Sequence, residues 1–299
     1  MALMLNGLQD APNTLLNKSV RRVKPFATSC LPTSLMNQQV LTLDMVLVVA
    51  PKQSEQERRA RHADSMRCRA ALEWRTLLEL AKDPVGIEEI LGGEDTHAKN
   101  QEAFELPSRL IAKIFLFRTI YRGSGWSFAN DPDFMHVSAK SDFWDDMNDK
   151  FYRKYKGIDA CHTRWKDTCM AGNPIIGPLG RSWTCPPKRD YRGELKVPWT
   201  TLTNYPVQGT GADVMMLARI MAKKRIADAG IQCDFISTVH DSIVVDTRQA
   251  NLEPLRDIFD QVFADLPSRI QSVFGYDWTT PMACESKYGP NMKDMHKFA

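Results

Sequence analysis

The sequence predicts an α+β protein in which short antiparallel strands accompany longer helices. Two apolar runs, 235–239 and 242–245, are too short for helices and rich in Ile, Val and Thr, which indicates a pair of strands. Residues 109–121 carry a stripe of side chains at four-residue spacing, and residues 213–229 repeat apolar positions at helical spacing. These three patterns predict one β-hairpin and two helices.

The segment SRLIAKIFLFRTIYRGSG carries two cations followed by two aromatic side chains, each four residues from the next: Arg109, Lys113, Phe117 and Tyr121. Successive members drift by only about 40° around a helix, so all four project from one broad face. The cations suit a polyanionic group such as a triphosphate, and the aromatic rings suit a flat base. The alternative is an ordinary amphipathic helix with Ile111, Ile114, Phe115 and Ile120 facing a core.

The segment NYPVQGTGADVMMLARIMAKKRI begins with Asn204, Pro206 and Gln208 and continues into the helical repeat at 213–229. Gly209 is expected to loosen the backbone where the helix starts. Polar amides at a glycine-rich helix start either contact nucleic acid or cap the helix.

His240 and Asp241 lie between the two strand-like runs and are expected to form a tight turn. Asp is a favoured turn residue because its side chain hydrogen-bonds to nearby backbone. A carboxylate at the crown of a hairpin is also well placed to bind a metal ion. The pattern is compatible with a structural turn and with a metal site.

Taken together, the segments resemble the polymerase region of family A (DNA polymerase I-like) DNA polymerases, of the phage replicative type. Residues 109–121 resemble the fingers helix, 204–213 the primer–template segment, and His240 with Asp241 the third catalytic motif. Two more segments match in the same order: GGEDTHAKNQEAFELPSR, which includes His97, leads into the fingers helix, and CESKYGPNMKDMH resembles the last palm strand and tail.

The resemblance implies a fragment of the polymerase right-hand fold, with an antiparallel palm sheet and a helical fingers subdomain. Residues 66–299 would form palm and fingers, with the fingers at about 106–194, and residues 1–65 are unmatched and expected to be disordered or aberrant. The thumb of the family lies upstream of the first motif, so it is expected to be missing. Further expected elements are helices around 76–82 and 252–273, a turn and strand at 177–183, and packing roles for Trp126, Phe128, Phe134, Trp144 and Phe151.

The implied activity is template-directed DNA synthesis, with nucleotidyl transfer from a deoxynucleoside triphosphate to a primer 3′-hydroxyl assisted by two Mg²⁺ ions. The catalytic residues would be Asp241, His240 and Lys113. The nucleotide-binding residues would be Arg109, Lys113, Phe117, Tyr121, Glu73 and His97. The DNA-binding residues would be Asn204, Gln208 and His240, and the metal ligands would be Asp241 and Asp64.

The first motif departs from the family pattern. In AALEWR, Glu73 takes the place of the carboxylate that screens the sugar 2′-hydroxyl, and counting back puts Cys68 where the metal-binding Asp belongs. Thiolates favour softer metals than Mg²⁺. Removing Met66–Arg69 would restore the pattern with Asp64 in place. Either a local bulge absorbs these four residues and Asp64 reaches Asp241, or the match begins near Met66 and the first metal site is lost.

Composition excludes few classes of protein. The formal net charge of +3 comes from residues 1–65, which hold eight Lys or Arg and five Asp or Glu, so the matched region is neutral. Seven cysteines without a CxxC pair argue against a disulfide framework and indicate a reducing compartment. The apolar run 40–50 is too short to span a bilayer.

The expected location is therefore the cytoplasm of a bacterial host or a phage-infected cell, without a membrane partner. The expected partners are primer–template DNA, deoxynucleoside triphosphates and, for a truncated or split polymerase, a separately encoded N-terminal half or a processivity factor. A catalytically defective DNA-binding protein that keeps the polymerase fold is the alternative function.

Overall fold

The computed structural model describes residues 63–68, 72–290 and 294–298, and for residues 63–68 it describes the backbone alone. All of these residues belong to one compact unit. The expectation of disorder or aberrant sequence at 1–65 lies outside the described residues, except for the backbone of 63–65.

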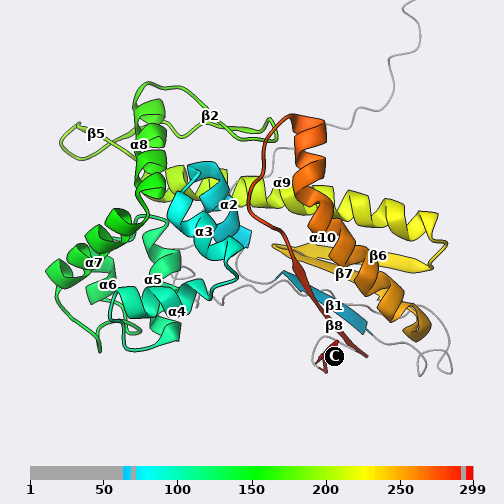
Figure 1. Ribbon diagram of the computed structural model, residues 1–299. Helices are drawn as coiled ribbons and strands as arrows, with labels where there is room; N and C mark the ends of the chain where they lie inside the picture. The colour runs from blue at the N-terminus through cyan, green and yellow to red at the C-terminus, as the bar shows by residue number, and fades with distance from the viewer. Residues whose placement is uncertain (1–62, 69–71, 291–293, 299) are drawn as a thin grey trace, which may run out of the picture. The chain divides into compact units, whose positions relative to one another are not determined.

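A five-stranded antiparallel sheet lies at one end of the described fold, in the order β6-β7-β1-β8-β9 (Figure 1). The expected hairpin is present as β6 and β7, which are connected by the two residues His240 and Asp241. The strands are β1 (Ala63–Cys68), β6 (Cys233–Val239), β7 (Ser242–Thr247), β8 (Cys284–Gly289) and β9 (His296–Lys297).

Two long helices, α9 (Trp199–Asp228) and α10 (Leu252–Phe274), form a common core with this sheet. α10 follows a short 3₁₀ helix, η2 (Gln249–Asn251). The core contains Val214 and Ala218 from α9 together with side chains from β7 and α10, namely Ile243, Val245, Leu255, Phe259, Val262 and Phe263. Each large apolar side chain buried in this way contributes roughly 1.5–3 kcal/mol, so the helices hold the sheet in place.

α2 (Leu72–Ala81) contributes to a second core together with six further helices, of which the last four lie within the range expected for the fingers, about 106–194. The six are α3 (Pro84–Leu91), α4 (Thr96–Ala103), α5 (Arg109–Thr119), α6 (Gly125–Ala129), α7 (Ser141–Lys154) and α8 (Lys156–Met170). Four of the five aromatic side chains expected to pack are buried there, Phe128, Phe134, Trp144 and Phe151. Trp126 is 68% exposed, so the expectation was wrong for this residue.

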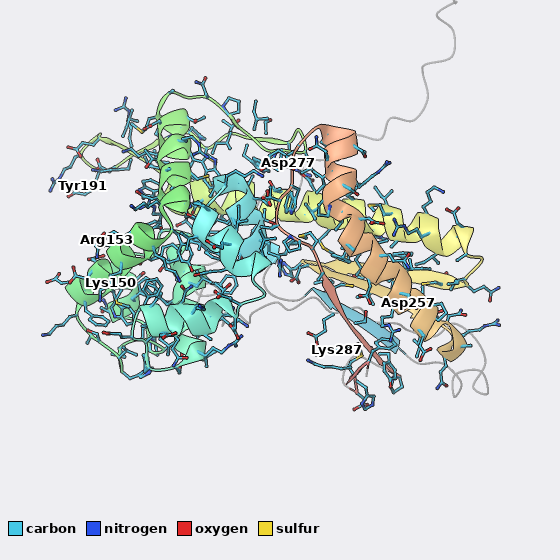
Figure 2. The ribbon with its side chains drawn as sticks, in the orientation of Figure 1. Lys150, Arg153, Tyr191, Asp257, Asp277 and Lys287 are labelled. Atoms are coloured by element: carbon cyan, nitrogen blue, oxygen red, sulfur yellow. The ribbon has the colours of Figure 1, made fainter. Side chains whose placement is uncertain are left out.

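The surface of this second group of helices carries exposed cations as well as exposed apolar side chains such as Leu91 and Leu110. Lys150 and Arg153 of α7 are exposed and lie at one edge of the view in Figure 2.

Two small hairpins connect α8 to α9. They are β2 (Ile175–Ile176) with β3 (Ser182–Trp183), and β4 (Lys188–Arg189) with β5 (Leu195–Lys196).

Helix α9 begins at Trp199, fourteen residues before the start expected from the sequence. Pro206 lies inside the helix although it cannot donate to the preceding turn, which normally disfavours such a position. Gly209 does not loosen the backbone but makes room for a neighbour, because a Cβ atom there would lie 2.6 Å from the Trp183 indole. Close packing of the β2–β3 hairpin on α9 therefore favours helix where local signals predict a break.

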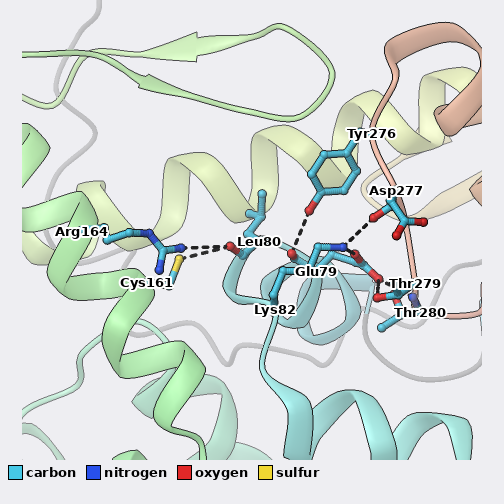
Figure 3. Close-up of polar contacts among 9 residues, drawn as sticks. All are labelled: Glu79, Leu80, Lys82, Cys161, Arg164, Tyr276, Asp277, Thr279 and Thr280. Atoms are coloured by element: carbon cyan, nitrogen blue, oxygen red, sulfur yellow. Dashed lines mark hydrogen bonds and ion pairs between the residues drawn. The ribbon is translucent and has the colours of Figure 1, made fainter.

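A buried carboxylate joins the end of α2 to the segment that leads into β8 (Figure 3). Glu79 is fully buried, and its Oε1 accepts hydrogen bonds from the Thr279 hydroxyl (2.8 Å) and the Thr280 amide. Its Oε2 accepts from Lys82 Nζ at 2.7 Å, and its backbone carbonyl accepts from the Tyr276 hydroxyl at 2.9 Å. Residues about 200 positions apart are thus tied to one turn of α2.

We expect Glu79→Ala to lower the free energy of unfolding by about 2–3 kcal/mol, because it leaves the buried Thr280 amide without an acceptor. Urea denaturation followed by circular dichroism measures the change. The matched control is Glu94→Ala, which removes an exposed carboxylate paired with Lys99 and should cost less than about 1 kcal/mol. Equal losses for the two variants would contradict the anchoring role of Glu79.

Candidate active site

Helix α5 presents the predicted stripe along a side that is not fully buried. Ser108 caps the helix by accepting a hydrogen bond from the Ile111 amide at 3.2 Å. Arg109 is exposed, while Lys113 and Phe117 are half-buried. The opposite side, with Ile111, Phe115 and Leu116, is buried in the core. The helix is therefore amphipathic and also carries an accessible stripe, so the two interpretations of its pattern are compatible.

Three predicted site residues from three elements meet through hydrogen bonds. The Tyr121 hydroxyl, just beyond α5, donates to Oε2 of Glu73 on α2 at 2.7 Å. Gln208 of α9 donates from Nε2 to the other oxygen, Oε1, at 3.4 Å. Burial and the Glu73 carboxylate raise the pKa of Tyr121 far above its usual range, so this phenol remains a donor at all physiological pH values. The Glu73 carboxylate is therefore held between two donors.

The start of α5 is linked to the start of α4. Asp95 caps α4 by accepting hydrogen bonds from the His97 and Ala98 amides at 3.0 and 3.1 Å. The same carboxylate accepts from Arg109 Nε at 2.7 Å. Partial burial acts to raise the pKa of Asp95, but the hydrogen bonds from Arg109 and from the backbone outweigh it and lower that pKa. Asp95 thus positions the first cation of the stripe.

His97 and Phe117 lie side by side on these two helices. His97 is buried, and its ring centroid lies 6.1 Å from that of Phe117. Lys113 lies one helical turn before Phe117 and forms no ion pair with the described residues. The structure therefore gathers Arg109, Lys113, Phe117 and His97 along α4 and α5.

Two further cations beside the stripe have structural partners. Arg118 pairs with Asp131 at 2.6 Å, and Arg122 pairs with Asp159 at 2.7 Å. Arg122 also donates from Nε to Nδ1 of His162 at 3.1 Å. Burial, together with the nearby guanidinium, lowers the pKa of His162 to about 3, so the ring is neutral and able to accept this hydrogen bond.

Asn204 and Gln208 lie one turn apart on α9, where the side chain of Gln208 is exposed and that of Asn204 is half-buried. Because the helix begins at Trp199, neither residue is its cap. The capping alternative is therefore excluded, and the two amides lie on one side of the helix.

The β6–β7 hairpin closes with the pair Val239 and Ser242, which leaves His240 and Asp241 as its crown. His240 is exposed and has a φ of +51°, a left-handed conformation that is uncommon for residues other than glycine. Asp241 is only 8% exposed. Two-residue turns of β-hairpins commonly need a positive φ at their first residue, so the tight turn accounts for this conformation.

The register of β1 determines how close the predicted metal ligands come. Asp64 pairs with Val245 on one side and Tyr288 on the other, and Met66 pairs with Ile243. Extending this antiparallel register brings Cys68 level with Asp241. Asp64 is four residues away along the strand, which corresponds to roughly 13 Å.

No bulge interrupts the pairing of β1 with β8, which runs without a shift from residue 63 to residue 68. The interpretation in which a bulge brings Asp64 to Asp241 finds no support in this register. Arg69, the last residue of the apparent insertion, lies outside the described residues.

The donor set for a metal is correspondingly small. Among the described residues, no three His, Cys, Asp or Glu side chains form a group suited to a metal ion. Mg²⁺ prefers one or two carboxylates together with phosphates and water. Asp241 fits as one carboxylate ligand, but the register of β1 does not bring Asp64 to it as the second.

Two residues that shape the candidate site, Asp95 and Trp183, were not predicted from the sequence. Asp95 was detectable, because an Asp directly before Thr96 and His97 is a typical helix N-cap. Trp183 had no comparable signal, because its contact with Gly209 joins two segments that are not neighbours in the chain.

Comparison with known proteins identifies the family of this chain. The sequence model of DNA polymerase family A matches residues 68–294, so the chain belongs to this family. It is 25% identical to DNA polymerase I of Aquifex aeolicus over 227 residues, covering 70% of this chain and 38% of the relative. It is 24% identical to DNA polymerase I of Pseudomonas aeruginosa over 234 residues, covering 75% of this chain and 24% of the relative.

Among solved structures, the chain is similar to the POL domain of Pol1 from M. smegmatis in complex with DNA primer-template and dNTP. The TM-score is 0.65 at 19% identity, over 81% of this chain and 43% of that chain. The predicted α+β polymerase fold is confirmed. The chain spans about a quarter to two fifths of the length of the curated relatives.

No helix in the described parts of the chain is long and apolar enough to cross a membrane.

We expect the stability of the helical core to fall with acidification because of His162. The unfolded chain takes up a proton near the ordinary pKa of 6.5 but the folded ring does so only at about 3, so protonation favours unfolding. Below pH 6.5 this group costs up to about 1.4 kcal/mol per pH unit.

The test compares urea denaturation at several pH values for wild type and His162→Gln. The glutamine retains an acceptor for Arg122 but does not titrate, so the variant should lose stability less steeply between pH 6.5 and 4. His136→Gln, which alters an exposed histidine, is the matched control and should follow the wild type. A His162→Gln curve as steep as that of the wild type would refute the assignment.

Proposed function

We propose that this chain catalyses template-directed DNA synthesis, transferring a nucleotide from a deoxynucleoside triphosphate to a primer 3′-hydroxyl. The observation that carries the proposal is the hydrogen-bonded group of Glu73, Tyr121 and Gln208, because each was assigned a polymerase role from a different segment. Membership of family A and the similarity to a Pol1 domain in complex with primer-template and dNTP support it.

The triphosphate would bind along α5. Asp95 holds the Arg109 guanidinium at the first turn, and Lys113 adds a second cation one turn later. A planar guanidinium and a point charge at this spacing suit a chain of phosphates. Phe117, in contact with His97, would provide the apolar surface for the base and sugar.

Sugar selection would depend on Glu73. Tyr121 and Gln208 each donate to one of its oxygens, so the carboxylate has a fixed orientation between the stripe and α9. A fixed carboxylate beside the sugar would exclude a 2′-hydroxyl by contact and by desolvation. The exposed Gln208 and the half-buried Asn204 would contact the primer–template.

The transfer step would take place at the crown of the β6–β7 hairpin. Divalent ions, when bound, stabilise the charge on the attacking and leaving oxygens in this class of reaction. Asp241 is the proposed carboxylate ligand from this chain, and the exposed His240 beside it would contact the primer terminus. Lys113 would act from α5 by orienting the triphosphate for in-line attack.

A second candidate function has a specific observation in its favour. Because β1 places Cys68 level with Asp241, the chain could retain DNA binding through Arg109, Lys113 and Gln208 without incorporating nucleotides. We also propose that the polymerase is of the phage replicative type and acts in the cytoplasm together with a separately encoded N-terminal half or a processivity factor.

Primer extension with Mg²⁺ and deoxynucleotides distinguishes the two functions. If the chain is a polymerase, wild type extends the primer and Asp241→Ala reduces the rate by at least about a hundredfold, as expected for loss of a group that stabilises the reacting oxygens. Asp257→Ala, an exposed carboxylate on α10, is the control and should retain full activity.

Two further variants test the first motif. From the register of β1, Asp64→Ala should leave the rate unchanged, whereas a similar loss in Asp64→Ala and Asp241→Ala would show that Asp64 reaches the site. Primer–template binding without extension by wild type would favour the DNA-binding protein. Primer extension that appears only after deletion of Met66–Arg69 would identify these four residues as the cause of inactivity in the wild type.

Discrimination between ribonucleotides and deoxynucleotides should depend on Glu73. Glu73→Ala removes the carboxylate, and we expect the ratio of kcat/KM for dTTP over UTP to fall by roughly tenfold or more. Tyr121→Phe should have a smaller effect in the same direction, because Gln208 still holds one oxygen. Glu88→Ala, an exposed change on α3, is the control. An unchanged ratio in Glu73→Ala would exclude the proposed selection.

A further inference from the structure

The β4–β5 hairpin, between α8 and α9, has no part in the site described above. Its nine residues, KRDYRGELK, include two acidic side chains and four cations, namely Lys188, Arg189, Arg192 and Lys196. All four cations are exposed. The hairpin therefore adds a local positive charge to a chain whose matched region is neutral overall.

Hydrogen bonds of the backbone and of Asp190 hold the turn of this hairpin, and the side chain of Tyr191 takes no part in them. Oδ1 of Asp190 accepts hydrogen bonds from the Arg192 and Glu194 amides at 2.8 and 3.0 Å. Gly193 has a φ of +80°, which lets the chain turn back so that the Asp190 amide donates to the Glu194 carbonyl at 2.9 Å. The backbone bonds therefore position Tyr191 at the tip.

Tyr191 is 89% exposed and lies at the extreme edge of the view in Figure 2. The guanidinium of Arg192 lies 5.1 Å from the centroid of its ring. A phenol ring in this position has no packing role in the fold. An aromatic face beside a guanidinium plane is the kind of surface on which a nucleobase stacks.

The acidic side chains of the hairpin are already paired. Glu194 forms an ion pair with Lys196 at 2.9 Å, and Asp190 approaches the same ammonium at 3.7 Å. Arg189 donates from Nη1 to the Gly193 carbonyl at 2.7 Å, which orients its guanidinium. Within the described residues, Lys188, Arg189 and Arg192 have no acidic partner. These three charges remain available to an anionic ligand.

We propose that the β4–β5 hairpin binds single-stranded DNA, and specifically the unpaired template strand of a primer–template. This rests on the proposed function for the choice of DNA. In a duplex the faces of the bases are covered by their neighbours, whereas a single strand offers both an accessible base for Tyr191 and phosphates for the cations. An acidic peptide would satisfy the cations but would leave the aromatic tip without a partner.

Fluorescence anisotropy with the full chain tests the inference on three probes: a blunt duplex, the same duplex with a single-stranded template extension, and the single strand alone. Tyr191→Ala should weaken binding of the two single-stranded probes by roughly tenfold and leave the blunt duplex unchanged. Tyr191→Phe retains the ring and should bind as wild type. Lys188→Gln and Arg192→Gln should each reduce the salt dependence, as the slope of log K against log [salt], by roughly 0.7.

Lys223→Gln removes an exposed charge from α9 and serves as the matched control, with no preferential effect on the single-stranded probes. An equal loss on blunt and extended DNA, or no loss in Tyr191→Ala, would overturn the inference. Tighter binding of an acidic peptide than of the single strand would also overturn it, in favour of a protein partner.

The failures of the two proposals can be told apart. If the wild type extends primers, and Tyr191→Ala binds the duplex with a single-stranded extension as tightly as the wild type, the hairpin inference alone is refuted. If the wild type does not extend primers, and Tyr191→Ala binds single-stranded DNA more weakly than the wild type, the polymerase proposal alone is refuted. Absence of all DNA binding in wild type refutes both.

Discussion

The carboxylate of Glu73 is the contact on which the arrangement of the candidate site depends. It accepts hydrogen bonds from Tyr121 at 2.7 Å and from Gln208 at 3.4 Å, so it joins α2, the end of α5 and α9. Tyr121 is half-buried, and a phenol partly removed from water needs an acceptor to offset its lost hydration. The contact adds a polar link between α5 and α9, whose side chains Phe115 and Val207 are also buried in the same core.

The helix that carries Glu73 is held at both ends. Glu73 lies in the first turn of α2, and Glu79 near its last turn is bonded to Thr279 and Thr280 in the segment before β8. α2 also packs against α8 and α9. One ten-residue helix thus contacts both hydrophobic cores, and a polar contact at each end determines its rotation and position.

The register of β1 shows how strictly strand pairing limits which residues can meet. The ladder between β1 and β8 runs without a shift, and the register of β1 with β7 brings Cys68 rather than Asp64 level with Asp241. The match to the family also begins at residue 68. The crown of β6–β7 and strand β1 belong to one sheet, and the register of β1 does not bring Asp64 to Asp241.

The sequence by itself determined the features that depend on short-range pattern. These are the β6–β7 hairpin, the face of α5, and the order of motifs that relates the chain to family A. Tertiary structure alone decided where α9 begins, because packing of Trp183 on Gly209 outweighs the local effect of Pro206. It also decided which groups meet, since Glu73 and Gln208 are 135 residues apart and no local propensity encodes such a contact.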